Sequence, residues 1–183
     1  MYPLNELQLL IRALEFAAHK HRDQRRKDRE ASPYINHPIT LLSILANEGS
    51  VTDVNALAAA LLHDTLEDTE TTEDELRQLF GDTITDIVLE VTDDKTLPKA
   101  QRKQEQIVNA ARASYPARLV KLADKIANLR DVLQTPPASW SIERKRDYFA
   151  WSNQVLDGLR GTHPELERSF DALLARGIRL FAE

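Results

Sequence analysis

A histidine and an aspartate end a segment that otherwise has the character of a buried helix. Residues 56–62 are all alanine or leucine, and His63 and Asp64 follow them directly. At helical spacing, the Asp64 carboxylate is predicted to lie on the apolar stripe of this segment, and Asp68 repeats the position one turn later. Carboxylates are seldom buried without a partner, so any fold of this chain must bring compensating charge to this point. Because a divalent cation stabilises an ionised Asp and a neutral His together, the sequence predicts a metal site.

Further candidate ligands stand in two other segments. His37 lies where a helix is expected to begin, with Asn36 or His37 itself near the cap and Pro38 in the first turn. Asp124 lies on the apolar face of a second helical segment, and Asn128 follows it by one turn. Two imidazoles and two carboxylates make a mixed nitrogen and oxygen set suited to manganese, iron or zinc, and the set comprises His37, His63, Asp64 and Asp124.

The other histidines are interpreted differently. His19 and His21 belong to the first predicted helix, and His21 continues its apolar stripe. We interpret His21 as a packed histidine, with a supporting role behind the metal ligands as the alternative. His163 opens the last predicted helix and is expected to help cap it.

The bulk properties of the chain indicate one enzyme-sized domain. With 183 residues and 42% hydrophobic content the chain can bury a sizeable core, and residues 1–183 are expected to form a single domain. Cysteine is absent, no apolar run is long enough to span a membrane, and the N-terminus lacks a signal pattern, which favours a cytoplasmic protein without membrane attachment. A net charge of −5 and a pI near 5.6 argue against a nucleic-acid binder.

Helical patterns run through the whole chain. Strong helix formers dominate, only five glycines occur, and alternating β patterns are missing, so the expected fold class is all-α, a compact multi-helix domain. Thr72 with Glu75 predicts a capping box, and Gly49 and Gly81 are expected to end helices. The predicted helices cover residues 4–22, 38–47, 53–67, 72–80, 83–92, 98–112, 116–133, 141–160 and 164–181.

Five segments carry a more specific signal. They read QRRKD, PYINHP, HDTLEDT, VTDDKTLP and VKLADKIANL, and they cover residues 24–28, 33–38, 63–69, 91–98 and 120–129. In this order they resemble the HD-domain metal-dependent phosphohydrolases, and within them the stand-alone (p)ppGpp hydrolases of the metazoan SpoT-homologue type. The resemblance implies a helical HD fold, one manganese(II) ion per chain held by the four ligands, and removal of the 3′-pyrophosphate from (p)ppGpp. Bifunctional relatives carry a synthetase domain after the hydrolase, and this chain is expected to lack one.

Two further acids lie one helical turn beyond the predicted ligands. Glu67 follows His63 by four residues, and Asp68 follows Asp64 by the same spacing. Hydrolysis of a phosphoryl group needs an aligned water, neutralised phosphate oxygens and a group that accepts the proton of the water. Both acids are therefore predicted to face the attacking water, and the family resemblance implies the same catalytic pair. The alternative is a solvated helix end, because a polar stretch begins at Glu67.

Basic residues gather in two parts of the chain. One run covers residues 25–27, and the other follows residues 92–94 and comprises Lys95, Lys99, Arg102 and Lys103. From the sequence alone, each run is either a solvated face or a patch that binds an acidic partner. The resemblance favours a small-molecule guanine nucleotide as the partner, and it implies substrate contacts from Arg26, Lys27, Tyr34, Lys99, Asn128, Arg144 and Tyr148.

With the resemblance, these patterns predict a manganese-dependent (p)ppGpp 3′-pyrophosphohydrolase. Water would attack the phosphorus attached to the ribose 3′ oxygen, and the products would be GDP or GTP plus pyrophosphate. A related HD phosphatase that removes orthophosphate from NADPH or another nucleotide is the alternative within the enzymes. A nucleotide-binding sensor without turnover is the alternative of another class, and the presence of both acids with all four ligands argues against it. The sequence leaves open the loaded metal, the oligomeric state, the preferred nucleotide and any protein partner.

Overall fold

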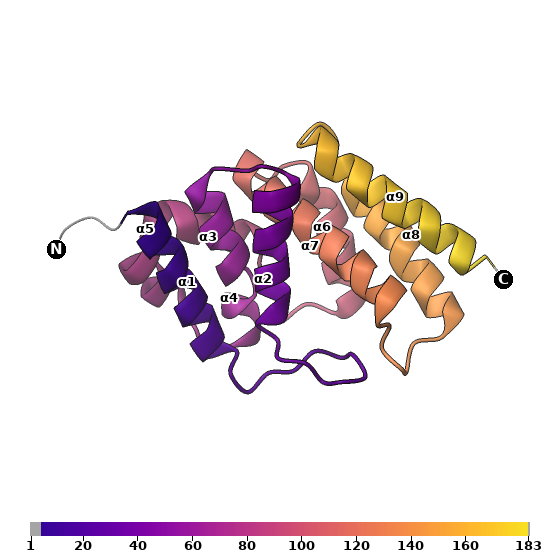
Figure 1. Ribbon diagram of the computed structural model, residues 1–183, viewed down its shortest axis with the longest axis horizontal. Helices are drawn as coiled ribbons and strands as arrows, with labels where there is room; N and C mark the ends of the chain where they lie inside the picture. Colours follow the sequence, from indigo (N-terminus) through magenta and orange to yellow (C-terminus); the bar gives the residue numbers. More distant parts are fainter. Residues whose placement is uncertain (1–4, 183) are drawn as a thin grey trace.

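The computed structural model describes residues 5–182, and helices dominate this part of the chain (Figure 1). Within it no strand forms, apart from an isolated bridge between Arg25 and Pro33, so the predicted all-α fold class is confirmed. No helix in this range combines the length and the apolar character needed to cross a membrane. The elements in chain order are α1 (Glu6–Lys20), α2 (Asn36–Ser43), the π-helix η1 (Ile44–Glu48), α3 (Val54–Leu62), α4 (Thr65–Asp68), α5 (Glu73–Val91), α6 (Lys99–Ala110), α7 (Tyr115–Gln134), α8 (Ile142–Leu159) and α9 (Pro164–Leu180).

Helices α3 and α7 form the centre of the molecule. The alanines and leucines of residues 56–62 are all buried, because α3 packs against α1, α2, α5 and α7 at the same time. Helix α7 contacts α2, α3 and α5 on one side and the α8–α9 pair on the other. That pair lies at the end of the molecule opposite α1 and α5 (Figure 1). Side chains at the end of α3 and in the middle of α7 therefore project into the interior.

The helix predicted over residues 53–67 is wrong in one respect, because the chain breaks it after Leu62. The Thr65 hydroxyl donates to the Leu62 carbonyl oxygen at 2.7 Å, and Nδ1 of His63 contacts the Ala60 carbonyl oxygen at 2.9 Å. Side chains thus take up carbonyl groups at the end of α3, in competition with continued helix formation. Asp64 lies in this break with φ −100° and ψ 0°.

Other helix ends differ from prediction in smaller ways. Helix α2 begins at Asn36 after Ile35, without a side-chain cap. Gly81 has φ +80° and kinks α5 at the predicted break, where a side chain would be strained. The capping box is only half formed, since the Thr72 hydroxyl accepts from the Glu75 backbone N–H at 3.2 Å while the Glu75 carboxylate pairs with Lys20.

Candidate metal centre and active site

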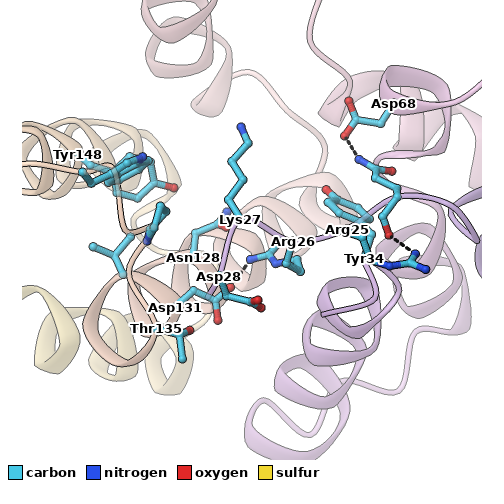
Figure 2. A pocket seen from close by; sticks show the side chains of 14 residues that line it. Arg25, Arg26, Lys27, Asp28, Tyr34, Asp68, Asn128, Asp131, Thr135 and Tyr148 are labelled. Atoms are coloured by element: carbon cyan, nitrogen blue, oxygen red, sulfur yellow. Dashed lines mark hydrogen bonds and ion pairs between the residues drawn. The ribbon is translucent and has the colours of Figure 1, made fainter. Parts of the chain in front are cut away.

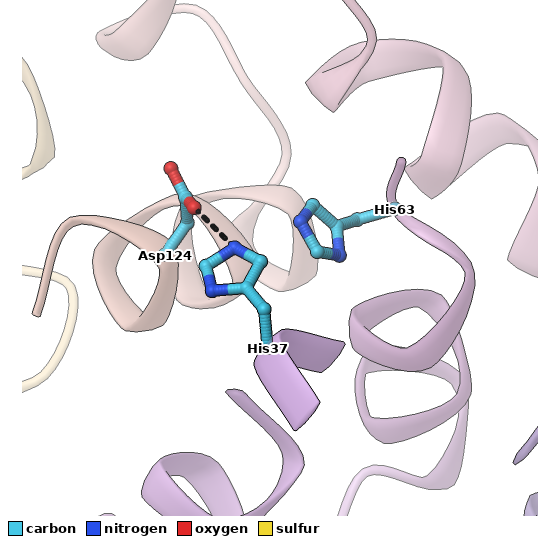
Figure 3. A group of neighbouring side chains, drawn as sticks. All are labelled: His37, His63 and Asp124. Carbon is cyan, nitrogen blue, oxygen red and sulfur yellow. Dashed lines mark hydrogen bonds and ion pairs between the residues drawn. The ribbon is translucent and has the colours of Figure 1, made fainter. Parts of the chain in front are cut away.

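Three of the four predicted metal ligands converge from helices that are far apart in the chain. His37 comes from the first turn of α2, His63 from the end of α3 and Asp124 from the middle of α7 (Figure 3). One candidate ligand atom from each lies within 4.8 Å of the others. Nε2 of His37 is 3.1 Å from Oδ1 of Asp124, and both imidazoles are buried. Such a group of inward-facing nitrogen and oxygen donors is typical of a metal site.

Asp64 lies beside this group but is not part of it. Its Oδ2 is 2.8 Å from Nε2 of His63 and also accepts a hydrogen bond from the Tyr34 hydroxyl. Tyr34 was predicted as a substrate contact, and here it holds Asp64 as well as lining a pocket. The structure therefore places the fourth predicted ligand next to the other three.

The charges of the cluster fit a divalent cation. Burial alone would raise the pKa of Asp64, but His63 and His37 hold that pKa well below its ordinary value. Burial would lower the pKa of His63, but Asp64 and Asp124 raise it to about 9. The carboxylates of Asp64 and Asp124 thus favour positive charge at this point, and a divalent cation supplies such charge.

The hydrogen bonding of the His63 imidazole also favours a metal site. Nε2 of His63 lies 2.8 Å from Oδ2 of Asp64 but does not have the geometry of a hydrogen bond to it. Nδ1 of His63 donates to the Ala60 carbonyl oxygen, and such a bond orients an imidazole so that its other nitrogen can serve as a ligand. The inward-facing Nε2 of His63 therefore fits a bound metal ion.

Asp124 is held by its own helix. Nδ2 of Asn128 donates to Oδ1 at 2.7 Å, and the buried ammonium of Lys125 donates to Oδ2 at 3.1 Å. Lys125 also donates to Oε1 of Gln106 at 3.0 Å. Burial would raise the pKa of Asp124, but Lys125 and the neighbouring imidazole of His37 keep it well below the ordinary value. Asn128, predicted as a substrate contact, therefore also orients a ligand.

Glu67 lies close to the cluster on α4. Its side chain is 18% exposed, and Oε2 accepts from the Asp93 backbone N–H at 3.2 Å. Burial, together with the charges of Asp64 and Asp93, raises the pKa of Glu67 to about 7. Lys95 and Arg102 are 4.0 and 3.9 Å from Oε1, too far for strong pairing. A carboxylate with this pKa can exchange a proton near neutral pH.

Asp68 is the second acid, and its two oxygens have different partners. Lys95 pairs with Oδ1, and Nε2 of Gln24 donates to Oδ2 at 3.0 Å. The Asp68 side chain is 23% exposed. Neither acid is therefore a freely solvated residue at a helix end.

Two adjoining pockets contain the predicted substrate contacts. The first has a volume of about 320 Å³, and Figure 2 shows Lys27 extending into it between the Tyr148 side and the Asp68 side. Among the described residues Lys27 has no ion pair. The second pocket has a volume of about 340 Å³ and is lined by Lys99, Arg102, Lys103 and Arg144.

Trp140 and Tyr148 line both pockets. Of the seven predicted contacts, the first pocket contains Arg26, Lys27, Tyr34, Asn128 and Tyr148, and the second contains Lys99, Arg144 and Tyr148.

Arg26, a predicted substrate contact, already has a charged partner within the protein. Its guanidinium pairs with Asp131 of α7 and lies 5.7 Å from the centre of the Tyr34 ring. The charge of Arg26 is therefore partly neutralised, whereas neither Arg25 nor Lys27 has an ion pair among the described residues.

Sequence reasoning missed the aromatic wall of the second pocket. Lys103 lies 4.7 Å and Lys125 4.4 Å from the centre of the Trp151 ring, and Arg144 lies 4.5 Å from that of Trp140. The chain has only two tryptophans, and both lie within eleven residues of each other. The closeness of the two tryptophans in the sequence could have indicated this aromatic wall.

Comparisons with known proteins agree with this geometry. Residues 13–148 match the family model described as HD domain. The chain is 52% identical over 173 residues to the guanosine-3′,5′-bis(diphosphate) 3′-pyrophosphohydrolase MESH1 of Danio rerio, which covers 94% of this chain and 96% of the relative. It is 51% identical to the Homo sapiens protein of the same name, over 96% of this chain and 99% of the relative. A solved structure described as a metazoan orthologue of SpoT that hydrolyses ppGpp superposes with a TM-score of 0.90 at 45% identity, over 96% of this chain and 97% of that chain.

The chain therefore belongs to the HD-domain family. Within that family it belongs with the MESH1 proteins, the metazoan SpoT homologues. Membership and the donor set together imply a divalent metal ion at this centre.

Proposed function

We propose that this chain hydrolyses (p)ppGpp at the 3′ position and releases GDP or GTP plus pyrophosphate. The relatives that share half of its sequence over nearly their whole length are named for this reaction. The observation that carries the proposal is the position of the histidine and aspartate cluster beside two pockets that share Trp140 and Tyr148, of which the first contains Lys27 and the second has an excess of cations. A nucleotide with phosphates at both ends of its ribose needs such a pair of pockets.

The proposed cofactor is one manganese(II) ion per chain. His37, His63, Asp64 and Asp124 would hold it, and the mixed nitrogen and oxygen donors support a first-row metal over magnesium or calcium. When bound, such an ion neutralises phosphate charge and makes water more acidic.

Glu67 and Asp68 are the proposed catalytic acids. Glu67, with a pKa of about 7, accepts the proton of the attacking water. Water oxygen bonds to the phosphorus on the ribose 3′ oxygen, and the bond from that phosphorus to the 3′ oxygen breaks. The proton taken from the water passes to the 3′ oxygen, so that a 3′ hydroxyl and pyrophosphate are the products. Asp68, held through both oxygens, orients the water.

The proposed nucleotide contacts divide between the pockets. Lys27 and Arg26 provide charge in the first pocket, and the Tyr148 ring between the pockets offers a face for the base. Lys99 and Arg144 bind phosphate in the second pocket, where Lys103 adds a further cation.

A panel of substrates tests the proposal. Manganese-loaded protein is incubated with ppGpp, pppGpp, NADPH, deoxynucleoside triphosphates and short RNA, and the products are separated by chromatography. Pyrophosphate from the alarmones should be the dominant product. Dominant release of orthophosphate from NADPH would favour the alternative phosphatase, and ppGpp binding without product under any metal would favour the sensor.

The proposal also covers the number of domains, the location of the protein and its partners. We propose that residues 1–183 form one domain, because α9 packs against α7 as well as α8. A cytoplasmic location and the lack of a nucleic-acid partner also belong to the proposal, and the net charge of −5 supports the latter.

A further inference from the structure

A buried histidine outside the metal centre connects to one of the catalytic acids. His21, the residue after α1, is only 2% exposed. Its Nδ1 lies 2.6 Å from Oε1 of Gln24, and Nε2 of Gln24 lies 3.0 Å from Oδ2 of Asp68 (Figure 2 draws the second bond). The amide of Gln24 thus bridges His21 and Asp68.

The chemistry of the three side chains decides which group donates and which accepts in each hydrogen bond of the bridge. An amide oxygen carries no proton, so Nδ1 of His21 is the donor and Oε1 of Gln24 the acceptor. The other end of the amide, a donor, then faces the Asp68 carboxylate. The Asp68 carboxylate accepts from the NH2 end of the amide, so Oε1 of Gln24 faces His21. Nδ1 of His21 then completes the bridge as the donor to this oxygen.

The same histidine supports a predicted metal ligand. Its ring lies 4.8 Å from the Tyr34 ring, centre to centre, and the Tyr34 hydroxyl donates to Asp64. Burial lowers the pKa of His21, which keeps the ring neutral with one proton to donate. Among the described residues Nε2 of His21 has no hydrogen-bond partner, so the donor at Nδ1 is its single polar link.

We infer that His21 is a positioning residue that acts through Gln24 to hold Asp68 in the orientation used for hydrolysis. The inference rests on the function proposed above, in which Asp68 orients the attacking water. If His21 only filled space, its volume would matter and its Nδ1 donor would not. Variants that keep or remove the donor distinguish these two roles.

The test compares variants that keep or remove the donor. His21→Leu removes the donor, whereas His21→Asn keeps an N–H at the same number of bonds from Cα. Gln24→Leu removes both hydrogen bonds of the bridge. Each is assayed for kcat and KM with ppGpp and manganese, for metal content and for thermal stability. His19→Leu, at an exposed position on α1, is the control.

Removal of the His21 donor should lower kcat by about tenfold, with KM within about twofold of wild type, since His21 acts through Asp68 and lines neither pocket. Gln24→Leu should lower kcat to the same extent, and kcat is the readout for this variant because Gln24 also lines the first pocket. The double variant His21→Leu/Gln24→Leu should lose no more than either single variant, because both break one bridge. His21→Asn should recover kcat to within about threefold of wild type, and His19→Leu should match wild type.

Several outcomes would overturn the inference. They are a wild-type kcat in Gln24→Leu, a double variant whose losses multiply, and His21→Asn as slow as a folded His21→Leu. If His21→Leu fails to fold, Gln24→Leu and His21→Asn still decide the matter, because Gln24 lies in the half-buried loop after α1. Absence of ppGpp turnover in wild type would instead reject the proposed function, and the positioning role with it.

Discussion

Nδ1 of His63 donates to the carbonyl oxygen of Ala60 at 2.9 Å, at the point where α3 ends. This bond fixes the imidazole so that Nε2 faces the donors of His37 and Asp124. It also satisfies a carbonyl that the broken helix leaves without a backbone partner. The end of a buried helix thus supplies both the position and the tautomer of a predicted metal ligand.

Removal of either carboxylate ligand should abolish tight manganese binding. Asp64→Ala and Asp124→Ala each remove an anionic donor from a buried cluster, so metal affinity should fall by about a hundredfold or more. Metal content after dialysis, measured by atomic emission, checks this. Asp157→Ala, an exposed acid on α8, is the control. Stoichiometric metal in either ligand variant would contradict the proposed coordination.

Glu67→Gln should lower kcat by about a hundredfold without loss of metal, because the amide keeps the size and polarity of the side chain but cannot accept a proton. Steady-state kinetics and metal analysis on one preparation separate the two effects. Glu15→Gln, on the exposed side of α1, should change neither. An unchanged rate would remove Glu67 from the mechanism.

Lys27→Ala and Lys99→Ala should each raise KM for ppGpp by about tenfold with a smaller change in kcat, because both cations bind phosphate and do not supply water. The KM of wild type should also rise with salt concentration more steeply than that of either variant. A fall in kcat alone would assign these lysines to the chemical step.

Two lysines one turn apart on α7 should have opposite effects on stability. Lys121 is 8% exposed and has no ion pair among the described residues, and burial together with Lys125 lowers its pKa. Lys121→Met should therefore raise the free energy of unfolding by about 1 kcal/mol. Lys125→Met should lower it, because the Asp124 carboxylate loses its ammonium partner. Urea unfolding of metal-free protein measures both, and a destabilised Lys121→Met variant would contradict this assignment.

The Glu48–Arg130 pair should make stability depend on pH. Both oxygens of Glu48 accept from Arg130 at 2.6 Å, which lowers the pKa of Glu48 below its ordinary value of 4.5. This stabilisation is present above the ordinary pKa and is lost as the pH falls through the lowered one. Glu48→Gln should therefore reduce the free energy of unfolding at pH 7 by about 0.5 kcal/mol, since the pair is partly exposed. The difference from wild type should shrink on acidification, and a constant difference from pH 7 to pH 3 would contradict the role of the charge.

The sequence by itself determined the helical class and the residue types of the metal centre. Helical periodicity depends on residues three or four apart, so it correctly placed Asp124 on the inner face of α7 and Asn128 one turn beyond it. The same periodicity failed at Asp64, because side-chain bonds to carbonyl groups broke the helix there. The spacing of residues along the chain does not show that side chains will compete with the backbone N–H groups for these carbonyl oxygens.

Only the tertiary structure decided which groups support the site. Gln24 and Asp68 are 44 residues apart, and Lys125 and Gln106 are 19 apart, so no local pattern joins them. These contacts exist because the helices pack around α3 and α7, and most buried polar side chains find a partner wherever the packing brings one. The residues that bind a metal can thus be recognised by their chemistry, whereas the residues that hold them in place follow from the packing.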